Sequence, residues 1–206
     1  MKIAMAKTKI TLKNTLNIIC KVIVLPLALI CKLEEIFGRK DSEVIFQLCG
    51  DAVALLPGLP GAFLRRAFYV MTLDHCSSHC HIGFGTVFAH RCSTVADYVY
   101  IGRYALIGSA HIGERTLIGS RVSIISSNAL HELDDNNQWT AFSADKIATV
   151  SISRDVWVGE GAIIAANIGE VCVIGSGAVI TTDVKPHVMM SGNPARFIKK
   201  LGKDNA

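Results

Sequence analysis

The sequence predicts a mainly β fold in which short parallel strands coil into a solenoid. Its C-terminal half repeats every six residues, and an aliphatic residue leads each unit, at Ile152, Val158, Ile164, Ile168, Ile174 and Ile180. A Gly or another small residue often follows the leading residue. A period of six differs from the period of two of a plain strand and from the 3.6 of a helix. Repeats of this length indicate a stacked, solenoid architecture.

The expected solenoid has triangular coils. If each hexapeptide is a short strand followed by a bend, three of them complete one coil, and the leading aliphatic side chains stack inside. Gly and Asn then take the backbone angles at the corners that other residues avoid. Parallel strands of successive coils pair along the stack, so the repeat predicts both the core and the hydrogen bonding.

The same repeat begins earlier, at Ile82, and becomes regular around Ile101. Two spacings are shorter than six: Ile107 to Ile112 lacks one residue, and Ile164 to Ile168 lacks two. We expect these two places to be local bends at corners, with the stack of coils continuing through them.

A polar insertion, residues 126–149, interrupts the repeat. It contains His131, Glu132, Asp134 and Trp139. A long polar excursion in an otherwise regular solenoid is usually functional, because ordering it costs conformational entropy. We therefore expect this loop to carry chemistry.

The N-terminal residues 1–73 are expected to be helical. Residues 14–36 are apolar but interrupted by Lys21, Pro26 and Lys32, and their longest unbroken apolar run is shorter than the roughly 18 residues of a membrane-spanning helix. Three interpretations stay open: a helix in the membrane surface, a helix packed on the solenoid or a neighbouring subunit, and a true span. The first is favoured.

Two further helices are expected before the first coil. Asp41 and Ser42 can cap one of them, and Pro60 suits the first turn of the other. Together they would cover the open end of the solenoid, whose first coil would otherwise expose unpaired backbone.

Composition limits the function further. Residues 1–40 hold eight Lys or Arg against two Glu, residues 41–184 hold eight against fourteen acids, and residues 185–206 hold five against one. The odd count of seven Cys favours free thiols in a reducing compartment, with Cys172 inside the solenoid. Two Trp and four Tyr offer little stacking surface, so nucleic acid is not an expected partner.

Two motifs resemble those of the hexapeptide-repeat acyltransferases, whose fold is a left-handed parallel β-helix. They are Asp155-Val-Trp-Val-Gly-Glu-Gly-Ala-Ile-Ile and Gly192-Asn-Pro-Ala-Arg, and they are similar to the maltose/galactoside O-acetyltransferase branch. The resemblance covers roughly residues 82–200. It implies a β-helix over residues 74–192 with the catalytic loop at 126–149, and a tail with a short C-terminal helix over residues 193–206.

The resemblance implies an acetyl-CoA-dependent O-acetyltransferase acting on a saccharide hydroxyl. His131 would be the general base, because a neutral imidazole can accept the proton of the hydroxyl. Glu132, Asp134 or Asp135 could orient its ring, although loop acids are more often simply solvated. Glu132 stands where that branch usually carries Pro. His90, His111 and His187 are reserve candidates for the base.

The family binds coenzyme A in a groove between neighbouring β-helices of a homotrimer. By resemblance, the small residues of the last coils would let the cofactor approach the backbone, and Arg196 and Lys199 would neutralise its phosphates. The alternative for these two cations is an ordinary basic C-terminal helix, and Trp157 could line the groove or pack between subunits. The full predicted set is Trp157, Gly159, Gly161, Ala165, Gly175, Ser176, Gly177, Arg196 and Lys199.

Two other functions stay open. One is a metal-dependent lyase of carbonic-anhydrase type on the same fold, with zinc held through His79, His81, His90 or His111; the other is a non-catalytic membrane-bound scaffold. The stretch from Asp74 to His81 is rich in His and Cys but lacks a second cluster with zinc-site spacing, so no metal is expected. The favoured prediction places the enzyme in the cytoplasm, at the inner face of the membrane, in exopolysaccharide or cell-surface glycan modification.

Overall fold

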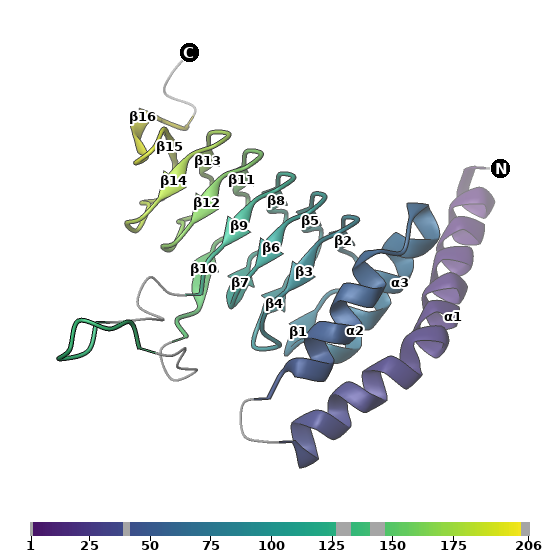
Figure 1. Ribbon diagram of the computed structural model, residues 1–206. Helices are drawn as coiled ribbons and strands as arrows, with labels where there is room; N and C mark the ends of the chain where they lie inside the picture. Colours follow the sequence, from purple (N-terminus) through teal and green to yellow (C-terminus); the bar gives the residue numbers. More distant parts are fainter. Residues whose placement is uncertain (1, 39–41, 127–132, 141–146, 203–206) are drawn as a thin grey trace.

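The chain forms a β-helical prism with three helices stacked on one end (Figure 1). This computed structural model describes residues 2–38, 42–126, 133–140 and 147–202, and the side chains within those ranges from residue 14 onward. The described part of the C-terminal segment lies at the end of the prism opposite the helices. The mainly β solenoid that the six-residue repeat predicts is confirmed.

Two helices cover the first coil, as predicted, and a third packs on them. They are α1 (Lys2–Phe37), α2 (Val44–Ala54) and α3 (Gly58–Thr72). Helices α2 and α3 contact the first coil, and α1 packs on both of them as the outermost layer (Figure 1). The backbone groups of the coil end find partners there: the carbonyl of Ala54 accepts the N–H of Gly85 at 2.9 Å, and the hydroxyl of Tyr69 accepts that of Phe88 at 3.4 Å.

Three parallel sheets form the faces of the prism, and each strand before the final hairpin is two or three residues long. Sheet A contains β1 (His75–Cys76), β4 (Thr94–Val95), β7 (Ala110–Ile112) and β10 (Val150–Ile152). Sheet B contains β2 (His81–Ile82), β5 (Tyr100–Ile101), β8 (Leu117–Ile118), β11 (Trp157–Val158), β13 (Val173–Ile174), β15 (Val188–Ser191) and β16 (Arg196–Lys200). Sheet C contains β3 (Val87–Phe88), β6 (Leu106–Ile107), β9 (Ser123–Ile124), β12 (Ile163–Ile164) and β14 (Val179–Ile180).

The core is a set of aliphatic columns that run along the prism. On sheet B the buried residues Ile82, Ile101, Ile118, Val158 and Ile174 stand in register, one per coil. Sheets A and C have corresponding columns. Burying each such side chain contributes about 1.5–3 kcal/mol relative to leaving it in water, so the leading position of the repeat largely holds the coils together.

The corners of the coils use left-handed backbone, and Gly does not always supply it. Gly161 and Gly177 have φ near +67°, but Tyr98, Asp155 and Val171 take the same conformation, with φ between +55° and +60°. The two short spacings of the repeat fall between β6 and β7, and after β12, where sheet C gives way to sheet A. They are corner bends, as expected.

The predicted cap of α2 was wrong. The N-cap residue is Glu43, which makes no side-chain capping bond, and the Ser42 hydroxyl donates to the Glu34 carboxylate at 2.9 Å instead. Glu34 of α1 caps α2 from outside, because its oxygens accept the N–H groups of Ile45 at 2.8 Å and Phe46 at 3.0 Å. Asp41, the other predicted cap, lies outside the described residues.

The predicted C-terminal helix was also wrong. Residues 196–200 form strand β16, which pairs antiparallel with β15 at the edge of sheet B. Gly192, with φ +99°, lies in the turn between them, and Ala195 donates its N–H to the carbonyl of Val179 at 2.9 Å. The tail motif therefore closes the last coil with a hairpin.

Candidate functional site

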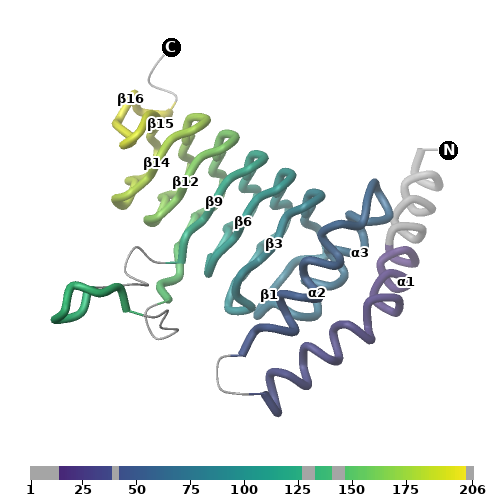
Figure 2. Tube along the Cα trace, in the orientation of Figure 1, coloured from purple at the N-terminus to yellow at the C-terminus, as the bar shows by residue number. Residues whose placement is uncertain are grey.

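The polar insertion leaves the prism at the corner between sheets C and A. It follows β9 and returns into β10, so it lies between the third and fourth coils. Its two ends are joined, because the N–H of Ala148 donates to the carbonyl of Ser126 at 2.6 Å. The described part of the loop, residues 133–140, stands away from the prism (Figure 2).

A row of hydroxyl and thiol groups lines the base of the loop. The hydroxyl of Ser109 lies 2.7 Å from that of Thr149 and 3.3 Å from the Sγ of Cys92. The hydroxyl of Ser126 accepts the N–H of Ser109 at 2.9 Å. Ser109 and Ser126 are buried, whereas Cys92 and Thr149 are exposed. This loop-base corner, residues 92, 109, 126 and 149, therefore presents polar groups to solvent on a fixed frame.

An imidazole lies on the same corner of the prism, two residues before Cys92. His90 is largely buried, and its Nδ1 lies 2.6 Å from Oε2 of Glu43. The other carboxylate oxygen of Glu43 accepts the N–H of Arg91 at 2.7 Å, which fixes the carboxylate in place. A carboxylate at one ring nitrogen sets the tautomer and leaves the other nitrogen for proton transfer. His90 thus has the orienting partner expected of a general base.

The predicted catalytic residues lie partly outside the described residues. His131 and Glu132 are among those not described. Asp134 is described and exposed, and its Oδ1 accepts the N–H groups of Asn136 at 2.9 Å and Gln138 at 2.8 Å. The Asp134 carboxylate therefore holds the turn of the small hairpin closed by Leu133 and Trp139. Its role in orienting His131 stays a prediction.

The other reserve candidates lie on different faces. His111 faces outward on sheet A, with its Nδ1 2.9 Å from the hydroxyl of Thr94. His187 is exposed on a late corner, 3.9 Å from Glu170. His187 lies on another corner, and His111, two residues after Ser109, contacts a hydroxyl and not a carboxylate, so His90 is the reserve candidate with an orienting carboxylate.

The fold separates the predicted cofactor residues into three places. Gly159, Gly161, Gly175, Ser176 and Gly177 come together at the corner between sheets B and C, in the fourth and fifth coils. A Cβ at Gly159 would lie 2.5 Å from the backbone nitrogen of Ser176, so coil stacking itself requires this glycine. A Cβ at Gly161 or Gly177 would contact nothing within 4 Å, so the backbone there is open to an approaching ligand.

The remaining predicted cofactor residues lie elsewhere. Trp157 faces outward on β11 and is 58% exposed. Arg196 and Lys199 are exposed on β16 at the edge of the same sheet. Ala165 follows β12 at the corner between sheets C and A, away from the glycines. Arg196 and Lys199 therefore lie near the last coils as expected, but on a strand and not on a helix.

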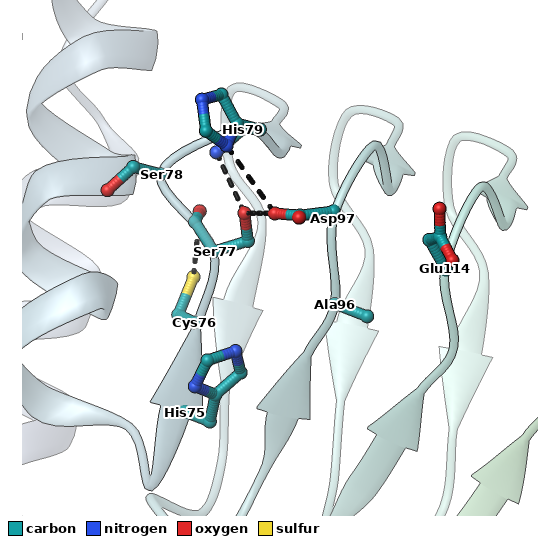
Figure 3. A pocket seen from close by; sticks show the side chains of 8 residues that line it. All are labelled: His75, Cys76, Ser77, Ser78, His79, Ala96, Asp97 and Glu114. Atoms are coloured by element: carbon teal, nitrogen blue, oxygen red, sulfur yellow. Dashed lines mark hydrogen bonds and ion pairs between the residues drawn. The ribbon is translucent and has the colours of Figure 1, made fainter. Parts of the chain in front are cut away.

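A shallow hollow opens at a third corner, between sheets A and B (Figure 3). There the Ser77 hydroxyl hydrogen-bonds to Oδ1 of Asp97, and His79 Nδ1 lies 3.5 Å from the same oxygen. The hydrogen bond from Ser77 lowers the pKa of Asp97, and His79 adds to this effect. In this arrangement the carboxylate contacts both partners and the imidazole does not lie between Ser and Asp, so it differs from a nucleophile–base–acid relay.

The four histidines of the alternative metal site do not converge within one chain. His79 lies at the hollow, His81 stacks on Tyr100 of sheet B at 4.8 Å, and His90 and His111 lie at the other places described above. Among the described residues, no three His, Cys, Asp or Glu side chains are grouped so as to hold a metal ion. The lyase alternative thus gains no support from the arrangement.

Comparison with known proteins identifies the architecture. The galactoside O-acetyltransferase of Escherichia coli is 29% identical over 128 residues, which are 60% of this chain and 55% of that protein. A hexapeptide-repeat-containing acetyltransferase from Vibrio cholerae superposes with a TM-score of 0.56 at 20% identity, over 76% of this chain and 91% of the other. The chain has the left-handed β-helix fold of the hexapeptide-repeat acetyltransferases.

Another structure of this fold is named a galactoside acetyltransferase in complex with coenzyme A. It has a TM-score of 0.54 at 20% identity and covers 76% of this chain and 80% of its own. No family model matches the chain. The chain spans about half the length of the curated relatives it matches.

Sequence reasoning missed part of the loop-base corner. Cys92, Ser109 and Thr149 were not among the predicted site residues, and neither was Glu43. A usable indication was present: the five-residue spacing from Ile107 to Ile112 contains Ser109 and marks the corner one coil before the insertion. Residues of neighbouring coils at that corner had to lie beside the two ends of the loop.

Proposed function

We propose that the chain is an acetyl-CoA-dependent O-acetyltransferase that modifies a saccharide hydroxyl at the loop-base corner. One observation carries the proposal: the only interruption among the described coils is the polar insertion, and it emerges from the corner of the prism that also carries an oriented imidazole, on the fold shared with named acetyltransferases. One of its sequence relatives is a galactoside O-acetyltransferase, which supports a sugar hydroxyl as the acceptor.

The proposed reaction needs one proton acceptor and no covalent acyl-enzyme. An imidazole takes the hydroxyl proton while the acceptor oxygen attacks the thioester carbonyl, and the C–S bond then breaks as the sulfur receives that proton. His131 is the proposed base. His90 is the second candidate because it lies on the same corner of the prism and Glu43 holds its ring.

Release of the free thiol of coenzyme A, with galactosides, maltose and cell-surface oligosaccharides as acceptors, tests the proposal. His131→Ala should lower kcat by about 10²–10⁴-fold, the usual contribution of a general base. His187→Ala is the matched control, since that imidazole is exposed on a late corner and lies 3.9 Å from Glu170. A large loss in His90→Ala with an active His131→Ala would move the base to His90. Full activity in both variants would refute an imidazole base.

The outer face of sheet B supports a homotrimer. Its outward residues form an in-register row along the prism: His81, Tyr100, Leu117, Trp157, Val173 and Met189. Leu117 and Trp157 are 46% and 58% exposed. The outward row of sheet A is polar by contrast, with His75, Thr94, His111 and Ser151. A flat apolar row of this length is suited to packing against a neighbouring copy.

Light scattering on a sizing column tests the assembly. Leu117→Glu should give monomers, because it places a charge in the middle of the apolar row. Ser151→Glu, which adds the same charge on sheet A, should leave the trimer intact. Coenzyme A would then be bound between prisms, near the open glycine corner and the cations of β16, and the monomeric variant should lose coenzyme A binding as measured by calorimetry.

A further inference from the structure

Helix α1 has two faces of different character. Its inner face packs on α2 and α3 and includes Cys20, Val24, Ala28, Cys31 and Glu34, all less than 8% exposed. These residues are spaced three or four apart, so they form one stripe along the helix. The inner face therefore fixes α1 on the end of the prism.

The outer face of α1 is apolar and exposed. Ten large apolar side chains in twenty residues are at least 39% exposed: Ile18, Ile19, Val22, Ile23, Leu25, Leu29, Ile30, Leu33, Ile36 and Phe37. Polar side chains normally occupy the solvent side of a helix that only packs on its own domain. A contiguous surface of this size marks a binding site.

Basic residues border this outer face. Lys21 and Lys32 are eleven residues apart, which is close to three helical turns, so both lie along the same side of α1. Lys2, Lys7, Lys9 and Lys13 precede the apolar stretch in the sequence. The two acids of residues 1–40 are already engaged, Glu34 with Arg91 at 2.6 Å and Glu35 with Lys32 at 2.6 Å.

We propose that α1 lies flat in the surface of an anionic lipid bilayer and holds the prism on it by its end. The outer apolar side chains enter the acyl boundary, and the lysine ammonium groups reach the lipid phosphates at its rim. Since α1 is the outermost layer and crosses the end of the prism (Figure 1), a plane can approach the whole helix without meeting the coils.

The packing of α1 argues against a membrane span. By length and composition, residues 14–37 could cross a bilayer. To do so, the helix would have to leave α2 and α3, which would expose Cys31 and separate the buried Glu34 from Arg91. That separation would take the nearest carboxylate, at 2.6 Å, from a guanidinium that is only 12% exposed and leave it the longer contact to Glu43 at 3.8 Å. A helix in the interface keeps every one of these contacts.

The charge distribution argues against a second α1 as the partner. Residues 1–40 carry six more cations than acids, so two such segments laid together would repel. An anionic headgroup layer complements the same charge, at about 1 kcal/mol for each Lys close to the surface.

Vesicle flotation of the full chain tests the proposal. The probes are vesicles of equimolar phosphatidylcholine and phosphatidylglycerol, and vesicles of phosphatidylcholine alone. The triple variant Val22→Glu/Leu29→Glu/Ile36→Glu changes three side chains, each more than half exposed, at the centre of the outer face. The matched control is Leu48→Glu, which changes a 68% exposed leucine on α2. Circular dichroism and light scattering confirm that each variant is folded and keeps its assembly state.

We expect the protein to float with the anionic vesicles and to bind phosphatidylcholine much more weakly. The triple variant should bind the anionic vesicles at least about tenfold more weakly, and Leu48→Glu should bind like the parent protein. Equal losses in both variants, or unchanged flotation of the triple variant, would overturn the assignment to α1. Protein in cell membranes should be released by alkaline carbonate; retention there would show a span and refute a surface helix.

Discussion

The Glu34 carboxylate is the place where a single change should loosen the helical end of the molecule. It lies between α1 and α2 with its side chain 3% exposed, and it accepts four hydrogen bonds, from Ser42, Ile45, Phe46 and Arg91, at 2.6–3.0 Å. Glu34→Gln keeps the shape but removes the charge. It removes the nearest counterion of the buried Arg91 guanidinium, which keeps only the longer contacts to Glu43 at 3.8 Å and Glu35 at 3.9 Å.

Removing one partner of a buried ion pair costs about 3–5 kcal/mol. Because a Gln oxygen can still accept one of the two backbone N–H groups, we expect the lower end, about 3 kcal/mol. Glu35→Gln is the matched control. That carboxylate is 45% exposed, pairs with Lys32 at 2.6 Å and lies 3.9 Å from Arg91, so its loss should cost less than about 1 kcal/mol.

Urea denaturation followed by circular dichroism, at fixed protein concentration, measures the difference. Amide hydrogen exchange gives a local readout, since the N–H groups of Ile45 and Phe46 should exchange faster in Glu34→Gln and not in Glu35→Gln. Equal stability of Glu34→Gln and the parent protein, within about 0.5 kcal/mol, would refute the argument from a buried, fully engaged carboxylate.

The same group predicts a pH dependence. Burial raises the pKa of Glu34, but its hydrogen bonds from Ile45, Phe46, Ser42 and Arg91 outweigh this and leave the pKa below its ordinary value. A lowered pKa in the folded state stabilises the fold above the ordinary Glu pKa of about 4.3. That contribution is lost as the pH falls through the folded pKa. Below about pH 4, the stability of Glu34→Gln should therefore fall less than that of the parent protein.

Three further predictions concern the coils. Gly161→Ala should lower the free energy of unfolding by about 1 kcal/mol, because only the positive φ of this residue opposes a Cβ. Gly83→Ala should lower it by about 3 kcal/mol, because the new Cβ would overlap the backbone of the next coil. Val171→Asn should raise stability by about 1 kcal/mol, since a β-branched residue is strained at φ +55°; denaturation midpoints check all three variants. Of the seven thiols, Cys92 should react first with a disulfide reagent, because it is exposed, while burial and the adjacent Cys49 thiol raise the pKa of Cys31 to about 12. Cys92→Ser should remove the fast phase of the reaction between the thiols and this reagent.

The sequence is informative about the prism because its repeat couples local and global structure. Each leading aliphatic, such as Ile118 or Ile174, is both the bend marker of its hexapeptide and the core residue of its coil, so one period predicts strand, corner and core together. The C-terminal strand β16 could not be found this way. Its sequence, Arg-Phe-Ile-Lys-Lys, is compatible with a helix, and only pairing with β15 at the edge of sheet B decides between the two.

The site was harder to predict because its residues are not related by the repeat. Glu43 and His90 are 47 residues apart and belong to a helix cap and a coil corner, so no period connects them. The capping of α2 by Glu34 depends likewise on how α1 packs, and Ser42 carries an ordinary cap sequence that the structure uses differently. Contacts between elements without a common repeat need the three-dimensional arrangement.

The two proposed surfaces make a joint prediction. If the prisms stand side by side through sheet B around a threefold axis parallel to them, rotation keeps every α1 at the same end, and three outer faces meet one membrane together. Binding through three linked helices is far tighter than binding through one. Leu117→Glu, which lies in sheet B and not on α1, should therefore weaken flotation with anionic vesicles by at least about tenfold while making the protein monomeric. A monomeric Leu117→Glu that floats like the parent protein would show that one α1 suffices, and a trimeric Leu117→Glu would place the interface on another face.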